Sequence, residues 1–64
     1  MNITLNGEAT TTAATTVEEL VAEAGAPADG TAVAIDGEVV PRSQWGRKLD
    51  EGCSADILTA VQGG

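Results

Sequence analysis

The stretch that decides the fold is Thr31–Pro41, which reads TAVAIDGEVVP. The compact apolar run over residues 31–35 predicts a β-strand, and the following Asp36-Gly37 is typical of a two-residue hairpin turn. The next three residues are expected to return antiparallel, and the proline ends the strand because it has no backbone N–H to donate. A β-hairpin therefore stands in the middle of the chain, and the segments on either side must complete its sheet.

A second hairpin is predicted at the start of the chain. Residues 1–5, MNITL, alternate apolar and polar side chains, which places the apolar ones on one face of a strand. Asn6-Gly7 follows, and both residue types tolerate the positive φ that a type I′ turn requires. Residues 8–12 are expected to return as a weaker strand, although this threonine-rich run is also compatible with a loop.

A short helix is predicted between the two hairpins. Thr16 and Glu19 fit a capping box, in which the Thr16 hydroxyl accepts from the Glu19 N–H and the Glu19 carboxylate reaches back to the cap. The apolar positions that follow have the spacing i, i+3, i+4 and i+7, which predicts one apolar stripe: Val17, Leu20, Val21 and Ala24. Gly25 suits a left-handed position after the helix and Pro27 prevents continuation, so the helix is expected over about residues 17–24.

The last strand is predicted over residues 55–61, after a turn at 50–52. If Ala55 and Ile57 face the helix, Leu58 and Ala60 lie on the opposite, exposed face, where we interpret them as candidate partner contacts. The order of elements predicts an α+β fold, with a mixed sheet of four to five strands and one helix packed across one face. We expect a single domain over residues 1–60, followed by an extended flexible tail over 61–64.

Composition excludes several classes of function. The 64 residues leave room for one domain with a small core, and ten acidic against three basic residues give a net charge of −7. This charge argues against nucleic acid and against an anionic membrane surface. With no His and only one Cys, Cys53, the usual zinc sites and any His-based catalytic triad are excluded. We expect no metal, no bound cofactor, no autonomous enzymatic activity and, since no secretory leader is evident, a cytoplasmic protein.

All three basic residues and the sole aromatic residue fall in residues 42–48, RSQWGRK. Arg42 and Trp45 are candidate partner anchors, since Arg and Trp are enriched among interface hot spots. The alternative is that Trp45 caps a small core while the charges are merely solvated. Ser43 is a candidate cap of a single helical turn. Cys53 is interpreted as a bystander in preference to a redox or sulfur-relay residue.

The sequence ends in Val61-Gln62-Gly63-Gly64, and Gly64 is the candidate reactive residue. An α-carboxyl group has a pKa of about 3.3–3.7, so it is ionised at neutral pH and is a poor electrophile until a partner activates it, as in an acyl-adenylate. Glycine has no Cβ, which suits Gly63 and Gly64 to threading a narrow channel in an enzyme. Gln62 precedes them in the same channel-threading tail. The alternative is a flexible end without a function.

The whole chain resembles the small sulfur carrier proteins of thiamine biosynthesis, the ThiS family, which share the β-grasp fold of ubiquitin. The most specific pieces are residues 34–45, AIDGEVVPRSQW, and residues 60–64, AVQGG. Such carriers often have an Asp after the last glycine turn, where this chain has Cys53. The departure is local and concerns the shape of that turn.

The resemblance implies a specific chemistry. An E1-like adenylyltransferase would adenylate the Gly64 carboxylate with ATP, a persulfide donor would replace AMP to give a thiocarboxylate, and thiazole synthase would accept the sulfur. ATP would then be used by the activating partner and not held by the carrier. Three alternatives stay open: the small subunit of molybdopterin synthase, a ubiquitin-like modifier conjugated through Gly64, and an interaction domain with an inert tail.

Overall fold

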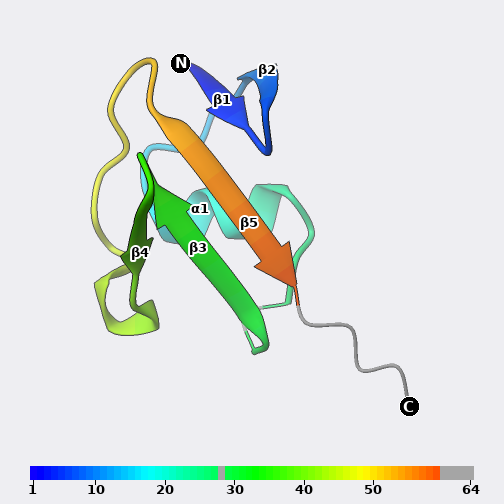
Figure 1. The fold of residues 1–64 in the computed structure, drawn as a ribbon, viewed down its shortest axis with the longest axis vertical. Coiled ribbons are helices and arrows are strands. Elements are labelled where there is room, and N and C mark those ends of the chain that lie inside the picture. Colours follow the sequence, from blue (N-terminus) through cyan, green and yellow to red (C-terminus); the bar gives the residue numbers. More distant parts are fainter. Residues whose placement is uncertain (28, 60–64) are drawn as a thin grey trace.

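The computed structural model describes residues 1–27 and 29–59, which form one five-stranded sheet with a helix against it (Figure 1). The strands run β1 (Asn2–Leu5), β2 (Glu8–Thr11), β3 (Thr31–Ile35), β4 (Glu38–Val40) and β5 (Ser54–Thr59). Their order across the sheet is β2-β1-β5-β3-β4. The pair β1–β5 is parallel and the other pairs are antiparallel, so the predicted mixed sheet of an α+β domain is confirmed.

Both hairpin turns have the predicted backbone. Asn6 and Gly7 have φ angles of 49° and 83°, and Asp36 and Gly37 have 52° and 82°. Positive φ at both central residues is the mark of a type I′ turn, whose twist matches that of the flanking strands. Asn and Asp are among the non-glycine residues that adopt this conformation most readily, which explains their presence at the first turn position.

Helix α1 (Val17–Glu23) begins where predicted, but one half of its cap differs. The Thr16 hydroxyl accepts from the Glu19 N–H at 3.2 Å, as expected. The Glu19 carboxylate, however, accepts from the Thr15 backbone N–H and the Thr15 hydroxyl, each at 2.7 Å. The prediction that it returns to Thr16 was therefore wrong by one residue. The reason is that Thr15 offers two donors, its backbone N–H and its hydroxyl, to the same carboxylate oxygen.

The apolar stripe of α1 is shorter than predicted. Val17, Leu20 and Val21 are buried, but Ala24 is exposed, so its inclusion in the stripe was wrong. The helix ends at Glu23, and Ala24 is its C-cap. The chain therefore departs from the helical path at Ala24, and this residue does not continue the apolar stripe. Ala26 packs against the core instead.

Figure 1 shows α1 against one face of the sheet, and the core is formed by the buried residues that these elements and their connections contribute. Its buried hydrophobic members come from α1, from every strand except β2, and from the connecting segments: Ile3, Ala14, Val17, Leu20, Val21, Val33, Ile35, Val40, Trp45, Leu49, Cys53 and Ala55. Most of these side chains are aliphatic, and Trp45 is the one aromatic ring among them. Across the described ranges, no helix has the length and hydrophobicity needed to cross a bilayer.

A short 3₁₀ helix, η1 (Arg42–Gln44), follows β4. The prediction that Ser43 caps this turn was wrong, because Pro41 occupies the N-cap position and Ser43 lies inside the turn. The φ of Pro41 is −59°, and its carbonyl accepts from the Gln44 N–H at 2.8 Å. The fixed φ of Pro41 and the hydrogen bond that its carbonyl accepts begin the turn without a side-chain cap.

Candidate functional site

The candidate site is built around β5, the central strand of the sheet. Ala55 is fully buried, Ile57 packs against the core, and Leu58 is 75% exposed. Because successive side chains of a strand point to opposite faces, Leu58 lies on the face away from α1. The prediction of which face each of these residues occupies is confirmed.

The two hairpin turns hold β5 from both sides. The Asn6 N–H donates to the Ala55 carbonyl at 2.8 Å, and the Asn6 side-chain carbonyl accepts from the Ile57 N–H at 2.8 Å. On the other side, the Asp36 N–H donates to the Ser54 carbonyl at 2.7 Å, and the Asp36 carboxylate accepts from the Ser54 N–H at 2.9 Å. The residues chosen for turn geometry therefore also anchor the strand that leads toward the C-terminal glycines.

The end of β5 is tied to the loop after α1. Thr59 pairs with Thr31 on β3, and their hydroxyl oxygens lie 3.3 Å apart. The Thr31 hydroxyl also donates to the Pro27 carbonyl. The next residues lie outside the described part of the chain, and with them four predicted site residues: Ala60, Gln62, Gly63 and Gly64. The predicted tail over residues 61–64 falls in the same segment.

We define the open face as the part of the sheet surface away from α1 that carries Ala32, Ala34, Val39, Asp56 and Leu58. Val39 is 71% exposed and, with Leu58, is one of the two exposed large hydrophobic residues of the described ranges. Sequence reasoning found Leu58 but missed Val39. The alternation of side chains along β4 explains the exposure of Val39. Val40 is buried, so the side chain of the preceding residue, Val39, points to the opposite face.

Trp45 is a core residue. It is 4% exposed, and its indole N–H donates to the Val40 carbonyl at 3.1 Å. The alternative in which Trp45 caps a small core is therefore the one that the structure supports, and its prediction as a partner anchor is not. A core of small aliphatic residues leaves room for one large ring, and the nearby carbonyl satisfies its only donor.

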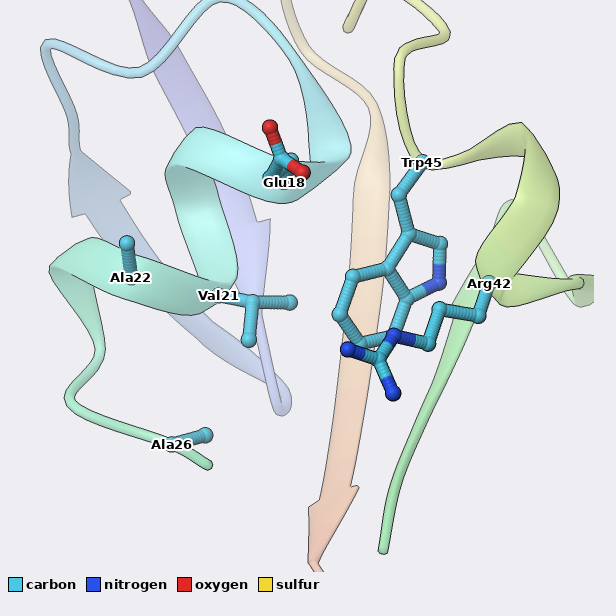
Figure 2. Close-up of a pocket in the computed structure, with 6 residues that line it drawn as sticks. All are labelled: Glu18, Val21, Ala22, Ala26, Arg42 and Trp45. Atoms are coloured by element: carbon cyan, nitrogen blue, oxygen red, sulfur yellow. The ribbon is translucent and has the colours of Figure 1, made fainter. Parts of the chain in front are cut away.

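Arg42 is exposed and ion-paired. Its guanidinium donates to the Asp29 carboxylate at 2.6 Å. Figure 2 shows Arg42 beside the ring of Trp45 across from Val21 of α1, where with Glu18, Ala22 and Ala26 they line a hollow of about 190 Å³. This is below the roughly 300–1,000 Å³ of usual small-molecule pockets. The structure thus separates Arg42, on the α1 side, from Leu58, on the open face.

The described residues carry little reactive chemistry of their own. Hydrogen bonds from the Thr15 backbone N–H and then the Thr15 hydroxyl lower the pKa of Glu19 from its usual 4.5. Within residues 1–27 and 29–59, no group of three or more His, Cys, Asp and Glu side chains is placed to hold a metal ion. Cys53 is buried in the core.

The ThiS family model matches residues 3–64, nearly the whole sequence. The chain belongs to the ThiS family. This match extends through the last two glycines, beyond the described residues, so it covers the segment on which the predicted chemistry depends.

Two solved structures are similar to this ThiS family chain. A crystal structure of the thiamine biosynthesis protein (ThiS) from Geobacter metallireducens matches with a TM-score of 0.83 and 29% identity, and the match covers all of both chains. An NMR solution structure of a thiamine biosynthesis protein from the same organism has the same TM-score and identity, covering all of this chain and 88% of that one. No curated protein sequence matches. The resemblance inferred from the sequence, and its β-grasp fold, are confirmed.

Proposed function

We propose that this chain is the sulfur carrier that supplies the sulfur of the thiazole moiety in thiamine biosynthesis. The observation that carries the proposal is the family match, which runs over the β-grasp body and through Gly64. The similarity of the body to a thiamine biosynthesis protein over its full length supports the same pathway. In this proposal the partner enzymes bind the β-grasp body, and the C-terminal glycine is the group that reacts.

The proposed chemistry takes place at the Gly64 carboxylate. A carboxylate oxygen attacks the α-phosphorus of ATP, pyrophosphate leaves, and an acyl-adenylate forms. The terminal sulfur of a persulfide donor then attacks the acyl carbon and AMP leaves, which gives an acyl disulfide. A thiol cleaves its S–S bond, and the products are a disulfide and the Gly64 thiocarboxylate. The thiocarboxylate holds sulfur in a nucleophilic form that is not released as free sulfide, and thiazole synthase is the acceptor.

The carrier's contribution is geometric. Leu58 on the open face and Gly64 are six positions apart, and an extended chain spans at most about 3.3–3.6 Å per residue. The adenylating centre of a partner that contacts Leu58 must therefore lie within about 20 Å of that contact. Gly63 and Gly64 add no side chains, so a narrow channel suffices for the last two residues. Gln62 enters the same channel in this proposal.

The proposed partners are an E1-like adenylyltransferase, a persulfide donor and thiazole synthase. ATP binds to the adenylyltransferase, and the carrier holds no cofactor and performs no catalysis. The net charge of −7 supports protein partners over nucleic acid or an anionic membrane surface. We place these steps in the cytoplasm, as expected from the sequence.

The test is an intact mass measurement after incubation with ATP, a persulfide donor and the adenylyltransferase, followed by fragmentation. A gain equal to the difference between sulfur and oxygen, confined to Gly64, is expected. A variant that lacks Gly63 and Gly64 is the control and should gain nothing. An unchanged mass, under conditions in which the enzyme modifies a known carrier, would overturn the proposal. Sulfur transfer to a molybdopterin synthase large subunit, but not to thiazole synthase, would move the carrier to that pathway.

A further inference from the structure

The two ends of β5 are held differently. Near its start, the parallel strand β1 pairs with Ser54 and Ala55, and the Asn6 side chain accepts from the Ile57 N–H. The pairing with β1 goes no further along β5, whereas the register with β3 continues to Thr59 (Figure 1). Among the strands of residues 1–27 and 29–59, β3 is therefore the one that holds the end of β5.

The last pair of the β3–β5 ladder lies at an end of each strand. Thr59 is the last residue of β5, Thr31 is the first residue of β3, and the two are partners in the register. Terminal positions of an element open more readily than its middle. Side-chain contacts at this pair therefore decide how firmly the end of β5 is held.

The two threonine hydroxyls form a relay with a defined direction. Their oxygens lie 3.3 Å apart, and the Thr31 hydroxyl also donates to the Pro27 carbonyl. A hydroxyl has a single proton to donate, so the Thr59 hydroxyl must be the donor between the two threonines. The relay runs from Thr59 through Thr31 to Pro27, and each hydrogen bond polarises the next. We call these three groups the threonine clasp.

The loop that carries Pro27 is itself anchored. Ala26 packs against the core, and its N–H donates to the Val21 carbonyl of α1 at 3.2 Å. Asp29 accepts from the Arg42 guanidinium of η1 at 2.6 Å. The clasp therefore connects the end of β5 to a loop that is tied to two other elements.

We propose that Thr31 and Thr59 are positioning residues for the reaction at Gly64. This inference rests on the proposed function. Gly64 follows Thr59 by five positions, so its carboxylate cannot lie farther than about 18 Å from the clasp. Opening the clasp would add Leu58 and Thr59 to the span between the body and Gly64. Effective concentration falls roughly as the −3/2 power of such a length, which corresponds to about a twofold loss here.

The experiment compares variants that remove one hydroxyl. Thr59→Val and Thr31→Val keep the β-branched shape that suits a strand. In each, the rate of thiocarboxylate formation at saturating adenylyltransferase should fall about twofold, while the KM for the carrier stays unchanged because the docking surface of the body is intact. The double variant should be no slower than either single variant, since the relay acts as a unit. Thr59→Ser keeps the donor and should react at the wild-type rate.

Thr10→Val is the matched control. The Thr10 hydroxyl also donates to a backbone carbonyl, that of Glu8 at 3.0 Å, but it lies in β2 at the edge of the sheet. This variant should react at the wild-type rate. If it is slowed as much as Thr59→Val, or if Thr59→Val reacts as fast as the wild type, the positioning role is overturned.

Amide hydrogen exchange measured by NMR gives a readout that does not depend on the enzyme. Exchange at the end of β5 should become severalfold faster in Thr59→Val and should not change in Thr10→Val. Unchanged exchange in Thr59→Val would overturn the clasp itself. A wild type that gains no sulfur at all would instead overturn the proposed function, which separates that failure from a failure of the clasp.

Discussion

The side-chain carbonyl of Asn6 accepts a hydrogen bond from the backbone N–H of Ile57 at 2.8 Å, across 51 positions of sequence. Asn6 is at the same time the first central residue of a type I′ turn, with φ of 49°. One residue thus shapes the β1–β2 hairpin and holds the middle of β5. The strand that leads to the C-terminal tail is therefore stabilised by a hydrogen bond from a distant turn.

Replacing Asn6 should separate these two roles. Asn6→Gly keeps the positive φ accessible but removes the acceptor, and should lower the free energy of unfolding by about 0.5–1.5 kcal/mol. Asn6→Ala should cost about 1 kcal/mol more, since alanine disfavours the left-handed conformation. Urea denaturation of the three proteins measures both steps. If Asn6→Gly is as stable as the wild type, the bond to Ile57 contributes nothing.

Only the first role of Asn6 could be predicted from the sequence. Asn-Gly and Asp-Gly predict type I′ turns, because such a turn depends only on the backbone preferences of its two central residues. The hydrogen bonds that the Asn6 and Asp36 side chains accept from the Ile57 and Ser54 N–H groups depend on which strands become neighbours. Local pattern does not specify that β1 pairs with β5, so these contacts appear only once the sheet is assembled.

Trp45 gives a second prediction. Trp45→Phe removes the indole N–H that donates to the Val40 carbonyl, together with part of the buried ring, and should cost about 1–3 kcal/mol. Trp45→Ala should cost about 3–5 kcal/mol, a large part of the total stability of so small a domain. Thermal and urea denaturation measure both. The affinity of folded Trp45→Phe for the adenylyltransferase should equal that of the wild type, and a loss of affinity at unchanged stability would return Trp45 to the interface.

Trp45 and Val39 show why the site was harder to predict than the fold. Residue type alone made Trp45 an attractive hot spot, but the scarcity of large side chains elsewhere draws it into the core. Val39 is the opposite case, because its apolar side chain suggests burial but is exposed. Val40 is buried, and successive side chains of a strand point to opposite faces, so Val39 faces solvent. Amphipathic periodicity was reliable for β5, where a polar residue, Asp56, separates two apolar ones.

Leu58→Glu should weaken docking while preserving the fold. The side chain is 75% exposed, so the substitution removes little from the core but places a charge where an apolar contact is proposed. Loss of a buried leucine contact corresponds to about 1.5–3 kcal/mol, so affinity for the adenylyltransferase should fall at least about tenfold. Ala24→Glu, which adds the same charge at an exposed site after α1, is the control and should bind normally. Equal affinity of Leu58→Glu and wild type would remove Leu58 from the site.

The Glu19 contacts predict a pH dependence of stability. Because the folded-state pKa of Glu19 is lowered, its contribution is present above the usual pKa of 4.5 and is lost as pH falls through the lower folded value. Glu19→Gln should therefore be less stable than the wild type at pH 7, and the difference should shrink in acid. Glu18→Gln, in the same helical turn, is the control, because it removes the same charge but leaves the hydrogen bonds between Thr15 and Glu19 in place. Urea denaturation across this range checks the comparison, and a difference that grows in acid would contradict it.

Gly64→Ala tests whether the last residue must lack a Cβ. If the tail threads a narrow channel, the added methyl group should reduce the rate of thiocarboxylate formation at least about tenfold, because even small displacements of a reacting group are costly. Affinity for the adenylyltransferase should change little, since the open face is intact, and thermal unfolding should match that of the wild type. Gly46→Ala is the control, because a Cβ there meets nothing within 4 Å and no positive φ is required. Equal rates of modification for Gly64→Ala and wild type, measured by intact mass over time, would refute the steric role of the terminal glycine while leaving the carrier chemistry in place.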